Sequence, residues 1–345
     1  MKAVFVAQQS QIKINDIQSP QLKSPGDIVV RMKACGLCGS DLEKIYGAYG
    51  MSSGRLGHEP AGEVIRVGDN VKDFAVGDRV FVHHHVACYS CHYCRHGDFT
   101  MCANYQSSNI DPCGLAEEFV VPEWNVSRGG VIRLPDSVGF EAASLIEPLA
   151  CCLRALKKCR LQKGDDVAVL GAGPAGIMHL LLAKTLGAGT VFVSDVNQFR
   201  LDFAKRLGAV ALNASSGDLL STIKSATGVR GVDACIIATS SIKAMSQAFE
   251  ITRKGGDIML FGVPAKGSEL TIDASKLYSS EHSIIPSYAA SEVETNEAIR
   301  LIEARRIDIE SIITHRFDIS ASADAVKCAH EGKDAMKVIV TTKDL

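Results

Sequence analysis

The sequence predicts a mixed α/β protein with a β-rich, barrel-like first part and a doubly wound parallel sheet after it. Two patterns carry this prediction. Up to about residue 148, short β-like runs are separated by Gly, Pro and Asp, whereas from about Cys151 onward strands and helices alternate. The length of 345 residues exceeds what one hydrophobic core usually organises, so two domains are expected.

The first part contains runs of four to six residues that are typical of short strands, each followed by turn residues. These runs are Asp27–Met32, Gly62–Val67, Arg79–His83 and Phe119–Pro122. Regularly spaced short strands of this kind favour an all-β or barrel-like domain.

The second part alternates strands with helices, which indicates a parallel sheet covered by helices on both faces. Predicted strands are Val167–Leu170, Thr190–Asp195, Val232–Thr239, Asp257–Gly262 and Ser283–Tyr288; predicted helices are Ile177–Leu186, Gln198–Leu207 and Ser241–Thr252. Gly187 and Gly208 follow two of the helices, as C-terminal caps do. After Ser291 the pattern indicates a helix, Glu292–Arg305, and short strands ending in Lys337–Thr341.

Composition excludes several classes of partner. The formal net charge of -2 and the pI of about 6.6 give no basic face for nucleic acid or for an anionic membrane. The apolar run at the amino terminus is too short for a signal peptide. The apolar stretch 167–183 is interrupted by a glycine turn, Pro174 and His179, so it reads as a strand and a helix and not as a membrane span. We expect a cytoplasmic protein.

The turn Gly171-Ala-Gly-Pro-Ala-Gly176 follows a predicted strand and opens a predicted helix. Gly171 permits the tight turn, Gly173 lets the backbone approach a pyrophosphate, and Gly176 lets the helix pack closely on the strand. The pyrophosphate would lie at the helix N-terminus, beside Pro174 and Ala175, where free N–H groups favour an anion. The pattern predicts a Rossmann dinucleotide-binding domain.

Asp195 ends the next strand, 19 residues beyond Gly176. A carboxylate there accepts hydrogen bonds from the adenosine ribose hydroxyls and opposes a 2′-phosphate, so NAD is favoured over NADP. Arg200, five residues further on, weakens that opposition.

Four cysteines, Cys88, Cys91, Cys94 and Cys102, stand in the pattern C-x2-C-x2-C-x7-C. Closely spaced thiolates in a loop can wrap one zinc ion tetrahedrally, and four protein ligands leave no open position, so the predicted site is structural. An iron–sulfur cluster is the rival. Its usual pattern has a shorter last gap and a following proline, whereas Ala103 follows here.

The three consecutive histidines His83, His84 and His85 precede this segment. Because they end a strand and the four thiolates already saturate an ion, we assign them no catalytic role. Seven other cysteines match no ligand pattern and are expected in the core. They are Cys35, Cys113, Cys151, Cys152, Cys159, Cys235 and Cys328.

A second set of candidate ligands is scattered along the chain: Cys38, His58, Glu59 and Glu147. A thiolate, an imidazole and a carboxylate make a three-ligand zinc site with an open fourth position. Spacing alone does not link these residues, because each taken singly is more often a core cysteine, a satisfied histidine or a surface acid.

Resemblance links them. The stretch Gly57-His-Glu-Pro-Ala-Gly62, with Val67-Gly68, Val71 and Gly77-Asp-Arg-Val80 after it, resembles the signature of the zinc-containing alcohol dehydrogenase family. Cys38-Gly-Ser-Asp41 is similar to that family's first catalytic ligand motif, and the four-cysteine segment and the glycine turn match its structural zinc loop and cofactor domain. The similarity covers essentially the whole chain, in the right order.

The resemblance implies a GroES-like β-barrel catalytic domain over 1–148, an NAD-binding domain over 149–287 and a return to the catalytic domain over 288–345. It makes Cys38 and His58 ligands of a catalytic zinc. Glu147, in Ile-Glu-Pro, resembles the sorbitol, polyol and threonine dehydrogenase branch, in which Glu59 can also bind; which carboxylate binds directly stays open.

The implied reaction transfers hydride from a secondary alcohol or polyol to NAD in a cleft between the domains, with zinc lowering the pKa of the substrate hydroxyl. Ser40 would carry the proton away. Many relatives have a histidine at the position of Glu43, so a histidine relay is not expected there. The resemblance also implies a homo-oligomer, a tetramer or a dimer.

Three alternatives remain. A metal-free reductase of the same fold would lack the zinc-ligand residues. A non-catalytic nucleotide-binding or structural protein would not need them. A threonine-type amino-alcohol dehydrogenase would differ only in its substrate. Candidate pocket side chains are Tyr46, Tyr49, Ser107, Asn109 and Tyr288.

Overall fold

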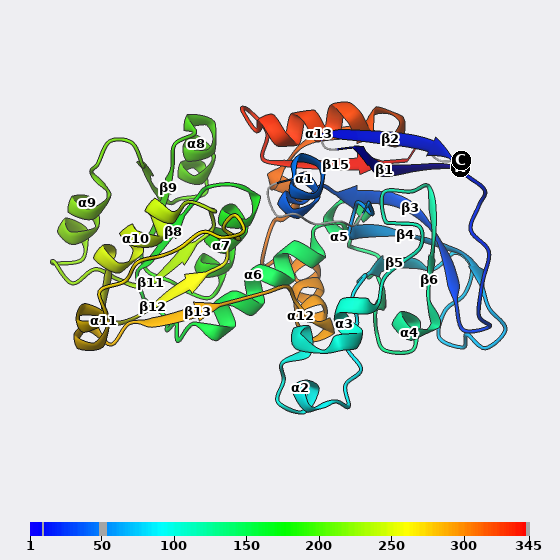
Figure 1. Ribbon diagram of the computed structural model, residues 1–345, viewed down its shortest axis with the longest axis horizontal. Helices are drawn as coiled ribbons and strands as arrows, with labels where there is room; N and C mark the ends of the chain where they lie inside the picture. Colours follow the sequence, from blue (N-terminus) through cyan, green and yellow to red (C-terminus); the bar gives the residue numbers. More distant parts are fainter. Residues whose placement is uncertain (9, 48–53, 343–345) are drawn as a thin grey trace. The chain divides into compact units, whose positions relative to one another are not determined.

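The chain divides into two units, each built around its own sheet (Figure 1). Unit 1 comprises Met1–Ala150 and Ala289–Leu345, and unit 2 comprises Cys151–Tyr288. The computed structural model describes residues 1–8, 10–47 and 54–342. The domain borders expected from the sequence are 148/149 and 287/288.

The main sheet of unit 1 has the strand order β14-β15-β3-β4-β5-β7, and β6 also pairs with β3. All pairs are antiparallel except β14 with β15, which is parallel. The strands are β3 (Ile28–Gly36), β4 (Glu59–Val67), β5 (Arg79–Val82), β6 (Glu118–Val121), β7 (Val131–Arg133), β14 (Ile313–Asp318) and β15 (Lys337–Thr341). A separate two-stranded sheet pairs β1 (Lys2–Gln8) with β2 (Gln11–Asp16).

Strand β3 is the centre of unit 1, because β4, β6 and β15 all pair with it. Its residues are almost all buried and pack with apolar side chains of the neighbouring strands, such as Val64, Val80 and Phe119. At its end, Gly36 is opposite Glu59 of β4 on one side and Ile339 of β15 on the other. The last strand of the chain is thereby brought beside the residues that follow β3.

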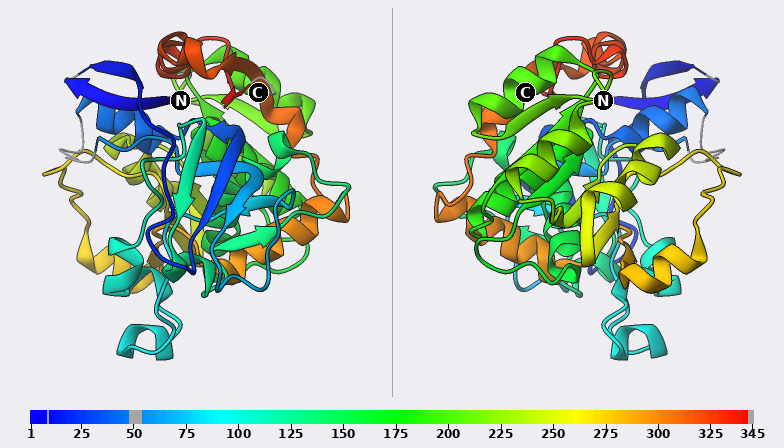
Figure 2. Two further views of the ribbon diagram at one scale, coloured as in Figure 1. Left: turned by 90° about the vertical axis from the view of Figure 1, so that its right-hand side faces the viewer. Right: turned by 90° about the vertical axis from the view of Figure 1, so that its left-hand side faces the viewer.

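The helices of unit 1 are short in the connections between strands and longer near the end of the chain. They are α1 (Gly39–Tyr46), α2 (His92–Arg95), α3 (Ala103–Ser107), α4 (Glu123–Val126), α5 (Phe140–Ala143), α12 (Glu292–Glu303) and α13 (Ser322–Glu331). Helix α6 (Ile146–Lys158) begins in unit 1 and continues into unit 2. Figure 2 shows the segment around α2 projecting away from the sheet of unit 1.

Unit 2 is a parallel sheet with the order β10-β9-β8-β11-β12-β13, the order of a doubly wound dinucleotide-binding fold. Its strands are β8 (Val167–Leu170), β9 (Val191–Asp195), β10 (Val210–Asn213), β11 (Val232–Ile237), β12 (Thr252–Leu260) and β13 (Ser283–Pro286). Its helices are α7 (Pro174–Thr185), α8 (Gln198–Arg206), α9 (Leu219–Ala226), α10 (Ile242–Ile251) and α11 (Ala274–Ser280). Apolar residues of α9 and α10 pack with Leu170, Cys235 and Ile237 of the sheet.

The predicted α/β class is confirmed, and strands β8 and β15 have the predicted bounds. Gly187 and Gly208 adopt φ of 88° and 83° just after α7 and α8, as predicted for glycine caps. The sequence did not predict α6, α9, α11, α13 or β10, and it gave no bounds for β14, one of the short strands expected in the tail. Strand β12 begins at Thr252, five residues earlier than predicted, because it starts directly where α10 ends.

None of the described helices is both long enough and apolar enough to cross a bilayer.

His179, on α7, is completely enclosed in unit 2, and neither of its ring nitrogens has a hydrogen-bond partner in the described part of the chain. Burial lowers the pKa of His179 to about 3. An unfolded chain takes up this proton near pH ~6.5, so below that pH the unfolded state binds more protons and the free energy of unfolding falls until about pH 3.

We therefore predict that His179→Leu reduces the loss of stability between about pH 7.5 and about pH 5 by about 2 kcal/mol relative to the wild type. Urea unfolding at the two pH values measures this difference. His330→Leu, at an exposed histidine, is the matched control and should keep the wild-type pH dependence. An unaltered pH dependence in His179→Leu would contradict the prediction.

Candidate functional site

Cys38 is the N-cap residue of α1, so the turn of chain after β3 holds its thiol at the start of a helix. The carboxylate of Asp41, in the first turn of α1, accepts hydrogen bonds from the backbone N–H of Cys38 at 3.3 Å and of Gly57 at 3.1 Å. Asp41 is fully buried. It therefore ties the segment that carries Cys38 to the segment that carries His58.

Gly57 fixes the approach of the chain to His58. Its φ is 74°, in the left-handed region, and a Cβ added there would lie 2.6 Å from the backbone nitrogen of Leu115 and 2.8 Å from Sγ of Cys35. Only glycine fits this position without moving its neighbours. This steric requirement explains why a glycine precedes His58 in the Gly-His-Glu motif.

The structure brings three of the predicted ligands together. One ligand atom each of Cys38, His58 and Glu59 lies within 4.8 Å of the others. Nδ1 of His58 is 3.4 Å from the Asp41 carboxylate, and Nε2 is 3.5 Å from the hydroxyl oxygen of Ser40. A carboxylate at Nδ1 holds the proton on that nitrogen, so Nε2 is the atom of His58 that is available to a metal ion.

The surroundings of His58 favour positive charge. Burial by itself lowers the pKa of His58, but the negative charges of Asp41 and Cys38 outweigh it and raise the pKa well above the usual value. Burial likewise raises the pKa of Asp41, yet the charge of His58 lowers it to about 2. A cation bound at Nε2 would occupy the same favourable potential as the proton.

Glu59 begins β4 and is completely buried, and it pairs with a lysine from the far end of the chain. Nζ of Lys337, the first residue of β15, donates to Oε2 of Glu59 at 2.6 Å and to the carbonyl oxygen of Leu37 at 3.0 Å. Burial by itself lowers the pKa of Lys337, but the Glu59 carboxylate outweighs it and raises the pKa, so the amine stays protonated.

Gly36 provides the space in which this pair forms. A Cβ on Gly36 would lie 1.8 Å from Oε2 of Glu59 and 3.0 Å from Cε of Lys337. The other carboxylate oxygen, Oε1 of Glu59, is enclosed and has no hydrogen-bond partner in the described residues. Since buried polar atoms are normally paired, Oε1 fits the third protein ligand of a cation held by Cys38 and His58.

Glu147 lies in the first turn of α6 and is buried, with 5% of its surface exposed. Its negative charge helps to raise the pKa of Lys337, so its carboxylate is close to the Glu59–Lys337 pair. It is not among the three residues whose ligand atoms lie within 4.8 Å of one another. Glu147 is thus placed around the site, with Glu59 nearer to Cys38 and His58.

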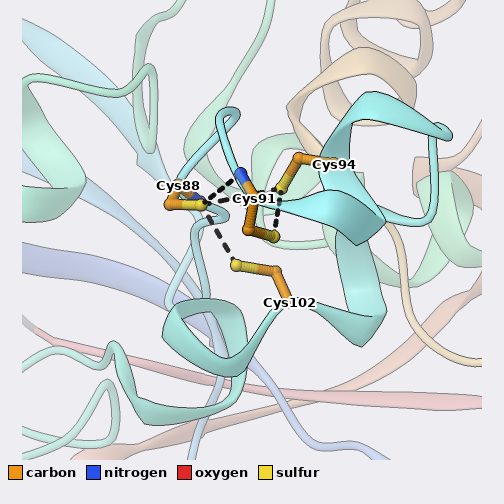
Figure 3. Close-up of side chains that lie close together, drawn as sticks. All are labelled: Cys88, Cys91, Cys94 and Cys102. Atoms are coloured by element: carbon orange, nitrogen blue, oxygen red, sulfur yellow. Dashed lines mark hydrogen bonds between the residues drawn. The ribbon is translucent and has the colours of Figure 1, made fainter.

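The sulfur atoms of Cys88, Cys91, Cys94 and Cys102 gather within 4.8 Å of one another (Figure 3). Sγ of Cys94 is 3.9 Å from that of Cys88 and 3.5 Å from that of Cys91. Zn–S bonds of about 2.3 Å in a tetrahedron give sulfur–sulfur edges of about 3.8 Å, so the four thiols fit one zinc ion. All twelve cysteines lie in the described residues, and none of them forms a disulfide bond there.

Five of the seven cysteines expected in the core are buried, and Cys151 and Cys328 are half-buried.

Hydrogen bonds from the Ser90 hydroxyl and from the backbone N–H groups of Ser90 and Cys91 lower the pKa of the Cys88 thiol to about 5. The loop itself therefore favours a thiolate at the first of the four cysteines.

The glycine turn lies between β8 and α7 of unit 2. Gly171 has φ of 102°, and a Cβ on Gly176 would lie 1.9 Å from the carbonyl oxygen of Gly171, so both positions require glycine. At Gly173, the N-cap of α7, a Cβ would meet only Nη1 of Arg200, at 3.8 Å, which leaves room above the helix N-terminus. Pro174 and Ala175 form its first turn.

Asp195 ends β9, and its carboxylate accepts hydrogen bonds from the backbone N–H groups of Ala172 at 2.7 Å and Asn197 at 2.9 Å. The acid is thereby fixed beside the glycine turn. Arg200 lies close to Gly173, and its Nε is enclosed without a hydrogen-bond partner in the described residues. The turn, the acid and the arginine therefore lie next to one another and offer anion- and hydroxyl-binding groups.

The other predicted pocket residues are scattered. Tyr46 stacks on His330 with ring centroids 3.7 Å apart, and Ser107 and Asn109 make local hydrogen bonds. Tyr288, the last residue of unit 2, is 52% exposed. Tyr49 lies outside the described residues.

Three residues beside the Cys38–His58–Glu59 group were missed. Asp41 stands in the first ligand motif, which was a usable signal. Lys337 begins an apolar strand and gave none. His84 lies with its ring centroid 5.2 Å from that of His58, although it was read as a loop residue. At the position where many relatives have a histidine, Oε2 of Glu43 is enclosed without a hydrogen-bond partner in the described residues.

Comparison with known proteins agrees with these features. Residues 24–136 match the family described as alcohol dehydrogenase GroES-like domain, and residues 174–304 match the family described as zinc-binding dehydrogenase. A sorbitol dehydrogenase of Bacillus subtilis is 30% identical, over 99% of this chain and 97% of its own length. An L-threonine 3-dehydrogenase of Serratia proteamaculans is 31% identical, over 93% of this chain and 95% of its own.

Solved structures show the same similarity. The alcohol dehydrogenase TADH from Thermus sp. ATN1 has a TM-score of 0.89 at 26% identity, over 99% of this chain and 100% of its own. Two further neighbours were solved with nicotinamide cofactors, one from Sinorhizobium meliloti with NADP and one from Escherichia coli with NADH.

The fold and these relatives define the class of the protein: it is a dehydrogenase that acts on a CH–OH donor. Within that class, the chain belongs to the zinc-type medium-chain alcohol dehydrogenase family.

We predict that Lys337→Met lowers the free energy of unfolding by about 3–5 kcal/mol, because it leaves the buried Glu59 carboxylate without its counter-ion. Urea unfolding of protein treated with a chelator measures the loss. The double variant Lys337→Met with Glu59→Gln removes both charges and should recover a large part of it. A double variant as unstable as the sum of its two single variants would show that the pair is not coupled.

Proposed function

We propose that the protein is a zinc-dependent dehydrogenase that transfers hydride between the CH–OH group of a secondary alcohol or polyol and NAD. The observation that carries the proposal is the group of Cys38, His58 and Glu59, whose ligand atoms lie within 4.8 Å of one another. A thiolate, an imidazole and a carboxylate leave one position of a tetrahedral zinc ion open to substrate.

Zinc held there would supply a Lewis acid that lowers the pKa of an alcohol hydroxyl. Cys38, His58 and Glu59 are the proposed ligands, and Glu147 is the carboxylate that could exchange with Glu59. The enclosed and unpartnered Oε1 of Glu59 favours Glu59 as the direct ligand. Asp41 orients His58 through Nδ1.

The hydroxyl of Ser40 is the proposed first acceptor of the substrate proton. Its oxygen lies 3.5 Å from Nε2 of His58, so it is beside the proposed metal ligands. A hydroxyl can accept one proton and release its own to water, which suits a relay.

For the cofactor, we propose NAD bound by Gly171, Gly173, Pro174, Ala175, Gly176, Asp195 and Arg200. The N–H groups at the start of α7 would bind the pyrophosphate. The fixed carboxylate of Asp195 supports NAD, since it would repel a 2′-phosphate. Arg200 is placed to contact the cofactor near Gly173, and NADP is the less favoured alternative.

Cys88, Cys91, Cys94 and Cys102 are proposed to hold a second, structural zinc, because four sulfur ligands leave no position for substrate. From the family resemblance we also propose a cytoplasmic protein that forms a homo-oligomer, a tetramer or a dimer, with no nucleic-acid or membrane partner.

A threonine-type amino-alcohol dehydrogenase is the second candidate, supported by the relative of that name at 31% identity. It shares the proposed metal and cofactor chemistry and differs in the group next to the reacting carbon.

We predict that the purified protein contains about two zinc ions per chain and reduces NAD+ with a polyol or secondary alcohol, with NADP+ at least about tenfold less effective in kcat/KM. Metal analysis and a panel of polyols, secondary alcohols and L-threonine, each with both cofactors, measure this. Removal of zinc should abolish turnover, and re-addition should restore it. Full activity after complete removal of zinc would refute the proposal.

We further predict that Glu59→Gln lowers the zinc content from about two towards one per chain, whereas Glu147→Gln keeps about two, because Glu59 is the proposed direct ligand. Zinc analysis after gel filtration measures both variants, and each serves as the other's control at a buried glutamate. Loss of zinc in Glu147→Gln with full retention in Glu59→Gln would reverse the assignment.

A further inference from the structure

The three consecutive histidines after β5 have different surroundings. Nδ1 of His83 is 2.7 Å from Oε1 of Glu292, and the hydroxyl of Tyr89 donates to the other oxygen of the same carboxylate. Nδ1 of His85 is 2.5 Å from the carbonyl oxygen of Ser108. The rings on either side of His84 are therefore held by partners within unit 1.

His84 lies beside the proposed metal ligands. Its ring centroid is 5.2 Å from that of His58, with 52° between the ring planes. The ring of His85 is 4.0 Å away on the other side. The backbone at this point is fixed, because the side-chain amide of Asn125 donates to the carbonyl oxygen of His84 at 2.9 Å. His84 therefore presents a rigidly mounted ring next to the position that a substrate would occupy.

The hydrogen bonds of His84 are incomplete. Its Nδ1 is enclosed and has no partner in the described residues, while the residue as a whole is half-buried. A buried N–H without an acceptor is less common than a buried acceptor without a donor, so the proton of the neutral ring belongs on Nε2. The ring thus offers one N–H donor to a molecule outside the protein chain.

The charges around His84 determine which polar group of that molecule can bind to the ring. Lys44 is a positive charge that acts on the ring, and the metal ion proposed at His58 would add another. A neutral hydroxyl oxygen can accept a hydrogen bond there, whereas an ammonium group would meet positive neighbours and could not accept from an N–H. A ring in contact with His58 reaches the substrate atoms next to the reacting carbon.

We infer that His84 is a specificity-determining residue that donates a hydrogen bond to a second hydroxyl group of the substrate, on the carbon next to the one that is oxidised. The inference rests on the proposed function and narrows it to vicinal diols and polyols, in preference to simple secondary alcohols and amino alcohols.

The test compares 2,3-butanediol, 2-butanol and L-threonine as substrates of the zinc-loaded wild type and of His84→Phe. The two butane alcohols differ by the one hydroxyl that His84 would bind. We expect the wild type to prefer the diol to 2-butanol and to L-threonine, and His84→Phe to lose about tenfold or more in kcat/KM for the diol while keeping its value for 2-butanol.

Two controls separate this role from others. His315→Phe, at a half-buried histidine of β14, should keep the wild-type ratio of diol to 2-butanol. Zinc content of His84→Phe should equal that of the wild type. Calorimetric titration of 2,3-butanediol into zinc-loaded protein saturated with NADH should show weaker binding in His84→Phe, a readout independent of turnover.

The outcomes are distinct. If the wild type oxidises none of the three substrates, nor any alcohol of the wider panel, the proposed function fails. If it oxidises them but prefers L-threonine or 2-butanol, or if His84→Phe lowers the diol and 2-butanol equally through kcat, the inference about His84 is overturned and the dehydrogenase activity stands.

Discussion

A buried carboxylate must be balanced by positive charge, and this constraint explains the arrangement around β3 and β4. Glu59 is fully buried, and within the described part of the chain one of its two oxygens is paired, with Lys337, and the other is not. Asp41 is buried as well and faces His58. Each acid thus has one cationic partner, and Oε1 of Glu59 lies near the thiol of Cys38 without a hydrogen-bond partner in the described residues. A divalent cation bound by these two groups and His58 would satisfy them, which is why we interpret the cluster as a metal site and not as an ordinary ion-pair network.

This balance also links the two ends of the chain. Lys337 reaches Glu59 only because β15 pairs with β3, whose Gly36 lacks the side chain that would fill the space between them. Strand β15 therefore contributes the positive charge of Lys337 to the site and also pairs with β3 and β14 in the sheet. Removing it would leave β3 with an unpaired edge and Glu59 with no counter-ion, so the fold of unit 1 and the chemistry of the site depend on the same pairing.

Features that rest on local geometry could be predicted from the sequence. The glycine turn after β8 needs a left-handed φ at Gly171 and close backbone packing at Gly176, and both requirements are written in consecutive residues. The four cysteines likewise lie within one short segment. The group of Cys38, His58 and Glu59 could be assembled only through family resemblance, because their closeness depends on strand pairing between distant segments. Lys337 could not be found at all, since a lysine at the start of an apolar strand looks like a surface residue until its partner across the sheet is known.

His83, His84 and His85 show the same limit of sequence-based prediction within three consecutive residues. The three side chains are identical, so from the sequence they are interpreted in the same way and none of them is assigned a catalytic role. The chain bends at His84, directly after β5, and the three side chains meet different surroundings. Two of the rings meet an acceptor in the protein, Glu292 or Ser108, and the middle ring meets His58 instead. Identical neighbouring residues therefore have different partners. Nε2 of His83 and Nδ1 of His84 are both enclosed without a hydrogen-bond partner in the described residues, and of the two rings it is that of His84 that lies next to His58, where we propose that the substrate binds.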